Sequence, residues 1–183
     1  MDDITGSFRL GPDSGRVVIK TGRAGLAARA GHDLTLELTR WSATVTVPAD
    51  GVAAAAVTAE LDLGSLSVLE GTGGAKPLSD KDRRDILNTA SKILKGGTAR
   101  FTSTRIIPAA SGGAIEGTLT LNGATRPARL QLVSRGPAQY QGTATVRQTD
   151  YGITPYTGFF GALKLKDEVT VEVEADLTRA ARE

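Results

Sequence analysis

Cysteine is absent from this chain of 183 residues, and histidine occurs only once, at His32. The lack of cysteine excludes disulfides, thiolate zinc sites and cysteine nucleophiles together. Metal sites usually need several converging His, Cys or carboxylate ligands, and His32 with Asp33 supplies at most one pair. We therefore expect neither a metal site nor a cofactor.

The residues that nucleophilic catalysis needs are equally scarce. A Ser-His-Asp triad would have to use His32 as its base, and the chain has no Gly-x-Ser-x-Gly elbow to present a serine. Neighbours on a strand point to opposite faces, so His32 and Asp33 are poorly placed to act together. We expect His32 to cap a helical turn or to hydrogen-bond at a strand entry, and we expect no catalysis. The alternative is a small enzyme that uses His32, with Asp33 or Tyr151, on a bound ligand.

Long apolar runs and an excess of one charge are missing as well. The chain has 22 basic and 20 acidic residues, so its charge gives no reason to expect nucleic-acid binding. No stretch approaches the ~18 apolar residues of a membrane span, so we expect no stable membrane insertion. The opening Met1-Asp2-Asp3 is unlike a secretory leader, which predicts a cytoplasmic protein, or a periplasmic or secreted one only if a leader was removed.

What the chain does have is alternation of apolar and polar residues, the period of a β-strand with one wet face. Turn signals separate these runs, and Asn122-Gly123 is the strongest because a type I′ hairpin needs positive φ at both positions. Evenly spaced strands with one oily face form either a sandwich or a closed barrel, and the run of neighbours after residue 98 favours the barrel. We predict strands at 15–21, 33–47, 55–63, 98–107, 114–122, 126–135, 140–149 and 168–177, with a short one near 64–69.

One segment follows the helical period instead. Apolar residues between 80 and 95 recur at helical spacing, Ser79 is a candidate N-cap with Asp82 three residues on, and Gly96-Gly97 is a natural stop. The predicted fold is therefore all-β: an eight-stranded antiparallel lipocalin-like barrel with one amphipathic helix, at about 80–95, packed over an end. We expect one domain over 1–183, with its core at about 15–178.

The few aromatic residues are clustered, and five of the eight lie between Tyr140 and Phe160. Glycine and proline make 149–162 a loop, so the adjacent Phe159 and Phe160 must find shelter somewhere. They either plug the barrel end as core or form a lid or mouth for an apolar ligand. Charge is also uneven between Lys76 and Arg105, with eight basic and three acidic residues, either a rim for an anionic head group or a solvated helix face.

Three segments together resemble the YceI-like family of lipocalin-like barrels. They are Arg84-Asp85-Ile86-Leu87, the hairpin 117–127 and Thr149-Asp150-Tyr151-Gly152-Ile153. The resemblance implies an eight-stranded barrel around a long apolar tunnel that binds polyisoprenoids or similar amphiphilic lipids without catalysis, often as a homodimer. Many members are exported to the periplasm. The family's His and Phe-rich stretch after Arg-Asp is replaced here by Asn88-Thr89-Ala90-Ser91, so ligand identity carries over poorly.

We therefore expect a carrier of a hydrophobic small molecule or isoprenoid lipid; the alternative from another class is a stress-response scaffold with a filled barrel. A barrel of this size either is filled by its inward side chains or leaves room for one ligand. Candidates to line the interior and mouth are Leu36, Leu38, Val45, Phe101, Leu119, Leu121, Leu130, Val146, Tyr151, Phe159 and Phe160. Candidates to meet a head group are His32, Arg84 and Arg147.

Overall fold

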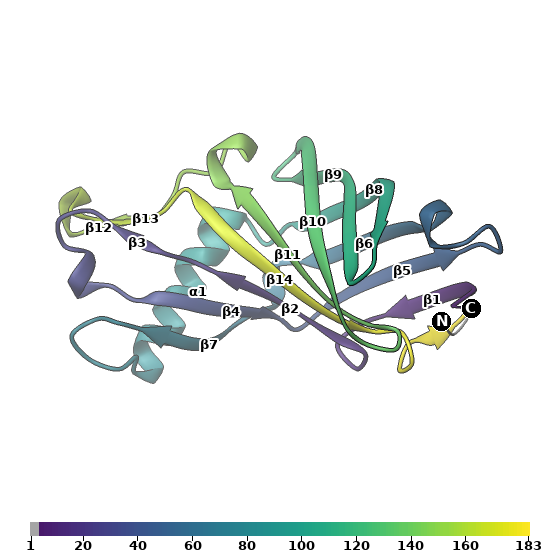
Figure 1. Ribbon diagram of the computed structural model, residues 1–183. Coiled ribbons are helices and arrows are strands. Elements are labelled where there is room, and N and C mark those ends of the chain that lie inside the picture. Colours follow the sequence, from purple (N-terminus) through teal and green to yellow (C-terminus); the bar gives the residue numbers. More distant parts are fainter. Residues whose placement is uncertain (1–3) are drawn as a thin grey trace.

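Alternation puts most of the chain into antiparallel strands, as predicted. The computed structural model describes residues 4–183, and Figure 1 shows a long curled sheet with a single α-helix behind its β2 and β4 strands. The strands of the main sheet are β1 (Gly6–Leu10), β2 (Gly15–Lys20), β4 (Asp33–Leu38), β5 (Trp41–Val47), β6 (Ala56–Asp62), β7 (Leu66–Thr72), β8 (Thr98–Ala109), β9 (Gly112–Leu121), β10 (Ala124–Gly136), β11 (Gln139–Arg147), β14 (Glu168–Asp176) and β15 (Ala181–Arg182).

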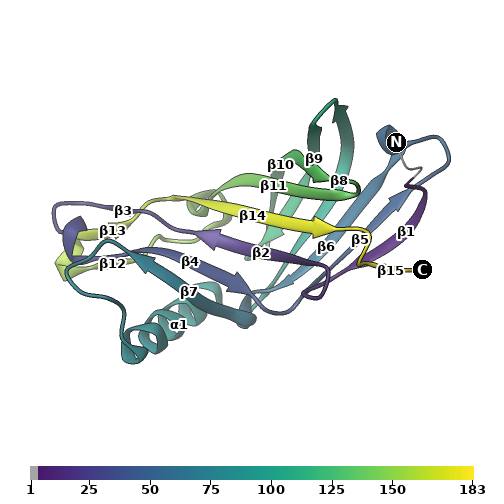
Figure 2. The same ribbon diagram turned by 60° about the horizontal axis from the view of Figure 1, so that its bottom comes forward.

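The main sheet corrects the predicted eight-stranded closed barrel. It has twelve strands in the order β15-β1-β5-β6-β8-β9-β10-β11-β14-β2-β4-β7, curled into a half-barrel with β15 and β7 at the ends of the order. A second sheet of three short strands, β12 (Thr157–Gly158), β13 (Leu163–Leu165) and β3 (Arg23–Ala24), lies at one end of the elongated molecule (Figure 2).

The strand count differs partly because a predicted strand is broken. The predicted strand 33–47 divides at Thr39 and Arg40 into β4 and β5, which take different partners. β5 pairs with β6 and β1, whereas β4 pairs with β7 and β2. In addition, β1 was not among the predicted strands, although Phe8 and Leu10 on it are buried in the core.

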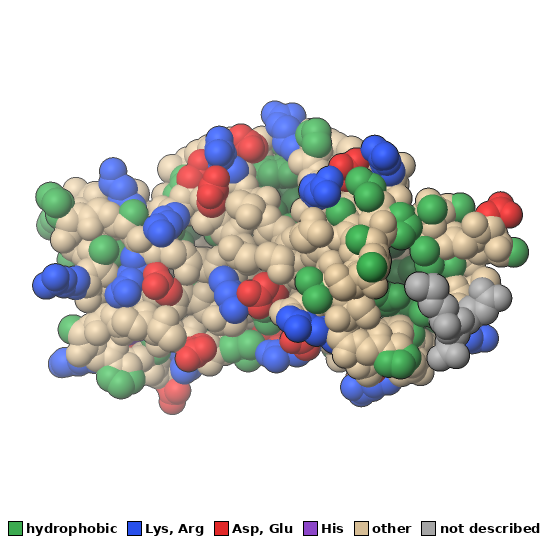
Figure 3. Space-filling view, in the orientation of Figure 1, with side chains coloured by type: hydrophobic (Ala, Val, Ile, Leu, Met, Phe, Trp, Pro, Cys, Tyr) green, Lys and Arg blue, Asp and Glu red, His purple; other side chains and the backbone are tan. Residues whose placement is uncertain are grey.

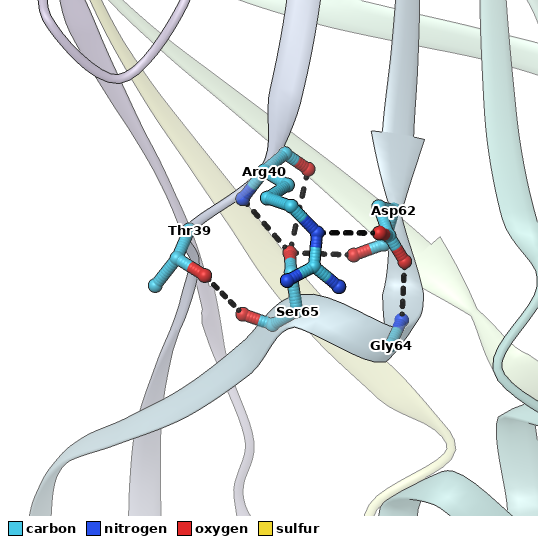
Figure 4. Close-up of polar contacts among 5 residues, drawn as sticks. All are labelled: Thr39, Arg40, Asp62, Gly64 and Ser65. Carbon is cyan, nitrogen blue, oxygen red and sulfur yellow. Dashed lines mark hydrogen bonds and ion pairs between the residues drawn. The ribbon is translucent and has the colours of Figure 1, made fainter.

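A cluster of polar groups joins this break to the turn between β6 and β7 through hydrogen bonds (Figure 4). Ser65, which is buried in the 3₁₀ turn η3 (Leu63–Ser65), accepts a hydrogen bond from the Arg40 backbone N–H at 2.9 Å and donates to the Asp62 carbonyl at 2.7 Å. The Asp62 carboxylate accepts from Arg40 Nε at 2.9 Å and from the Gly64 N–H at 2.8 Å. Thr39 donates to the Ser65 carbonyl at 2.9 Å. The backbone groups freed by the break therefore find partners inside the cluster.

Local turn and cap chemistry is as predicted at two places. Asn122 and Gly123 have φ of 51° and 77° between β9 and β10, the two positive angles of the predicted hairpin. The helix α1 (Asp80–Leu94) begins with a capping box in which Ser79 Oγ accepts from the Asp82 N–H at 3.1 Å and Asp82 accepts from the Ser79 N–H at 2.8 Å. The bonds from Ser79 lower the pKa of Asp82.

The hydrophobic core includes residues on both sides of the break, Leu38 on β4 and Trp41 on β5. Its buried members are Phe8, Leu10, Val17, Leu38, Trp41, Leu63, Ala99, Leu121, Val146, Tyr151, Ile153 and Leu177. α1 lies alongside β7 (Figure 2), and Arg83 on it donates to the Val68 carbonyl at 2.8 Å. Among the described residues, no helix is long and apolar enough to cross a membrane.

Candidate ligand-binding site

The residues predicted to line the interior include a buried group and a half-buried group. Leu36, Leu38, Leu121, Val146 and Tyr151 are buried, and all of these but Leu36 belong to the core cluster. The half-buried group consists of Val45, Phe101, Leu119 and Leu130. Of the half-buried group, Val45 and Leu119 pack against the core cluster, whereas Phe101 and Leu130 are not among the residues that do.

Glycines on neighbouring strands make room for two of the half-buried side chains. The Phe101 ring lies over Gly117 of β9, where an added Cβ would come within 2.6 Å of it. The Leu130 side chain lies over Gly142 of β11, where the corresponding distance is 2.9 Å. Both glycines are buried, so each of these side chains is seated on a neighbouring strand rather than extended into solvent.

The apolar face of α1 is also incompletely covered. Ile86, Leu87 and Ala90 recur at the helical spacing of a single face, yet no residue of α1 is buried. Only Ile93 and Leu94, at its C-terminal end, pack against the core cluster. An apolar helix face normally faces the core of its own domain, so this half-buried stripe is available to an additional apolar group.

Tyr151 lies in the packed core and away from solvent. It ends the 3₁₀ turn η4 (Gln148–Tyr151), and its carbonyl accepts from Asn122 Nδ2 at 2.9 Å, which ties this turn to the β9–β10 hairpin. Burial raises the pKa of its phenol. The side chain therefore stays neutral and acts as a packed core residue beside the β9–β10 hairpin.

Phe159 and Phe160 correct the expectation that the aromatic loop is sheltered. Both side chains are exposed, and they lie on the 3₁₀ turn η5 (Phe159–Gly161), next to the small three-stranded sheet. The two residues have φ of 48° and 54°, in the left-handed region of backbone conformation. They therefore do not plug the sheet as core residues.

The three predicted head-group residues are not brought together. His32 Nε2 lies 2.7 Å from the Lys76 carbonyl, a hydrogen bond at the strand entry of the kind expected from the sequence. Arg84 is exposed on α1, in a basic stretch that is mostly solvated. Arg147 lies 3.3 Å from Glu168, and this bond raises the pKa of its guanidinium.

A polar cleft lies instead at the end of β2, at a place that sequence reasoning did not single out. Its volume is about 560 Å³, and it is lined by residues of β2, β3, β4 and β7, by the 3₁₀ turn η1 (Ala28–Ala30) and by Lys166. The cationic side chains in its lining are Lys20, Arg23, Arg29 and Lys166, against two acids, Asp33 and Glu70. We call this site the cationic cleft.

Arg23 organises the cationic cleft. Its Nη1 donates to the Gly31 carbonyl at 2.7 Å and to the Ala28 carbonyl at 3.3 Å, and its Nε lies 3.2 Å from Asp33. Asp33 also accepts the Arg23 backbone N–H at 2.9 Å. Because Asp33 is bound to Arg23 while His32 is bound to Lys76, the adjacent His and Asp serve different partners.

The glycine-rich loop before α1 closes against this site. Gly73 and Gly74 both have φ of 73°, and a side chain at Gly73 or Gly74 would collide with Arg23 or His32 respectively. The loop is therefore more than a linker into the helix, because it packs against the Arg23 and His32 side chains. One signal in the sequence could have identified this end: residues 23–32 and 155–166 contain basic residues and no acidic ones.

Comparisons with known proteins agree with the geometry of the sheet. A model of the YceI-like domain matches residues 9–177. The crystal structure of BcnA from Burkholderia cenocepacia has a TM-score of 0.59 at 16% identity, covering 87% of this chain and 94% of that one. A YceI protein of Campylobacter jejuni has a TM-score of 0.54 at 13% identity, covering 81% and 84%. No curated protein matches the chain in sequence.

Proposed function

The chain belongs to the YceI-like domain family, and from that premise we propose that it binds one amphiphilic lipid without transforming it. The apolar tail lies against the half-buried stripe of α1 and the half-buried side chains of the sheet. An anionic head group lies at the cationic cleft. A polyisoprenoid carrying a phosphate is a ligand class that has both a long apolar tail and an anionic head group.

The observation that carries the proposal is the incomplete burial of α1. Ile86, Leu87 and Ala90 form an apolar stripe, but no residue of the helix is buried. Covering apolar surface gains about 25 cal/mol per Å² whatever the chemical detail of the tail. A long hydrocarbon chain can therefore bind here without polar contacts along its length.

The cationic cleft supplies the polar end of the proposed site. Among the described residues, no carboxylate lies within ion-pair distance of Arg29 or Lys166, whereas Lys20 is paired with Glu172 at 2.9 Å and Arg23 with Asp33. Arg29 and Lys166 are thus the cations most available to an anion. Arginine and lysine bind phosphate oxygens through charge-assisted hydrogen bonds, which are stronger than neutral ones.

The absence of catalysis is part of this proposal. It is supported by the hydrogen bond of the single histidine, His32, to the Lys76 carbonyl, and by the attachment of Asp33 to Arg23. The carboxylate that would orient this imidazole as a general base, Asp33, is thus bound to another residue. His32 in this arrangement holds the loop at 73–79 in place.

Two fluorescent probes test the two parts of the site separately: a long-chain alkyl phosphate and the alcohol with the same chain. We expect Leu87→Gln to weaken binding of both, while Ser91→Gln, at an exposed position of the same helix, leaves both unchanged. Arg29→Gln combined with Lys166→Gln should weaken binding of the phosphate by about tenfold or more and spare the alcohol. Failure of the wild-type protein to bind either probe would overturn the proposal.

A further inference from the structure

The three most exposed large apolar side chains among the described residues, Leu26, Phe159 and Phe160, gather at one end together with Tyr156. Among the described residues, Leu26 is 101% exposed, Phe160 113%, Phe159 63% and Tyr156 39%. We call these four residues the aromatic tip. An exposed apolar cluster of this kind on a folded protein usually marks a surface that contacts something else.

The small sheet brings the four residues together. β13 pairs with β12 on one side and with β3 on the other, and the Ala27 N–H donates to the Ala162 carbonyl at 2.9 Å. These pairings place the turn that carries Leu26 beside the turn that carries Phe159 and Phe160. In Figure 3 hydrophobic side chains protrude at the β12–β13 end of the molecule, with Lys and Arg side chains next to them.

The backbone at the aromatic tip adopts a conformation that bulky residues avoid. Phe159 and Phe160 both have positive φ, where glycine is normally favoured. Adjacent aromatic residues in this region are outliers, and such strain accumulates at functional sites. Phe160 is fully exposed and Phe159 mostly exposed, so packing in the core does not account for this conformation.

The surroundings of the aromatic tip carry charge of one sign. The three segments that build this end, 23–32, 73–79 and 155–166, contain five basic residues and no acidic ones, whereas the whole chain has 22 basic and 20 acidic residues. Acidic residues directly follow each of the three segments: Asp33, which is paired with Arg23, Asp80 and Asp167. Arg29, Lys164 and Lys166 are exposed. The basic residues of this end are Arg23, Arg29, Lys76, Lys164 and Lys166.

We propose that the aromatic tip docks reversibly on the surface of an anionic phospholipid bilayer. Aromatic side chains concentrate at the boundary between headgroups and acyl chains, and nearby Lys and Arg are attracted to anionic lipids. A few side chains projecting from two turns can enter a bilayer, but they are too small a patch for a stable protein interface of about 800 Å² per partner. The docking does not depend on a ligand inside the sheet, and it is tested separately.

Sedimentation with lipid vesicles tests the docking. We expect the wild-type protein to sediment with an equal mixture of phosphatidylcholine and phosphatidylglycerol, and less with phosphatidylcholine alone. Phe159→Ser combined with Phe160→Ser should reduce partitioning by about tenfold or more. Lys164→Gln should reduce it by about fivefold on the anionic vesicles only. Val52→Ser is the matched control, because Val52 is another exposed apolar residue but lies in the turn between β5 and β6.

A fluorescent reporter distinguishes insertion from adsorption. The single tryptophan, Trp41, belongs to the core, so the substitution Phe160→Trp adds one exposed indole. The emission of this indole should shift to shorter wavelength with anionic vesicles and be quenched by lipids brominated on the acyl chain. Wild-type binding by the double serine variant, or an unshifted emission of the Phe160→Trp variant, would overturn the proposal. So would a wild-type dimer that the double serine variant converts to a monomer without any vesicle binding, which would show that a second copy covers the tip.

Discussion

The Ala27 N–H donates to the Ala162 carbonyl at 2.9 Å, and this one bond joins two turns that are distant in the sequence. Gly25 has φ of 91° beside it, and a side chain there would collide with the same carbonyl. The geometry of the exposed end therefore depends on a close backbone approach that only glycine allows.

Replacing Gly25 tests that approach. Gly25→Ala should destabilise the protein by about 1–3 kcal/mol more than Gly51→Ala, because an extra methyl group in a filled space costs about that much. Gly51 is a matched control: its φ is 99°, but a side chain there would meet open space. Urea unfolding monitored by Trp41 fluorescence measures both variants. Equal losses would show that backbone strain alone, and not the Ala162 contact, makes glycine necessary.

Ser65 is predicted to hold the strand break and the β6–β7 turn together. Ser65→Ala removes the acceptor of the Arg40 N–H and the donor to the Asp62 carbonyl, so we expect a loss of about 1–3 kcal/mol in the free energy of unfolding. Ser67→Ala, two residues on in β7 and outside the cluster, is the control and should change stability by less than about 0.5 kcal/mol. Unfolding in urea measures both, and a Ser65→Ala variant as stable as the control contradicts the assignment.

The difference in burial between the packed core and the half-buried stripe of α1 predicts different losses of stability for the same leucine-to-alanine substitution. Leu38 is 2% exposed, so Leu38→Ala should lower the unfolding free energy by about 2–5 kcal/mol. Leu87 is half-buried on α1, so Leu87→Ala should cost about 1 kcal/mol or less in the lipid-free protein. Similar losses at the two positions, measured by calorimetry, would show that α1 is packed like the core.

Protonation of Asp167 is predicted to cause part of the loss of folding stability at low pH. Hydrogen bonds from the Thr149 hydroxyl and N–H lower the pKa of its carboxyl below the ordinary value of 3.8. Since the folded-state pKa is depressed, the stabilisation is present above 3.8 and is lost as the pH falls through the folded value. Thr149→Val should raise the pKa of Asp167 in an NMR titration and make the stability less dependent on pH in this range. Thr145→Val, at an exposed position of β11, should leave the pKa of Asp167 unchanged.

Much of the fold could be predicted from the sequence because it depends on local patterns. Alternation located most strands, the Asn122-Gly123 pair located a hairpin, and Ser79 with Asp82 located the start of α1. The break at Thr39 and Arg40 has no local signal, because it is set by Ser65 and Asp62, which are distant in the sequence. The open order of twelve strands could not be predicted for the same reason.

The candidate site was predicted less well. Alternation indicates which side chains face inward, but it does not show whether they become packed core, as Leu38 does, or stay half-buried, as Phe101 does. The cationic cleft depends on a close approach of β3 and β13, which no short motif encodes. Phe159 and Phe160 are exposed and both have positive φ, and phenylalanine in a sequence offers no signal for either property.

Native mass spectrometry of the protein as purified, followed by gentle organic extraction, tests the central claim most directly. The account predicts an additional bound mass that disappears on extraction and that is identified in the extract as an amphiphile with a long apolar tail. A protein that consistently carries no lipid, and takes up none when incubated with an isoprenoid phosphate, would contradict the account and favour a filled interior.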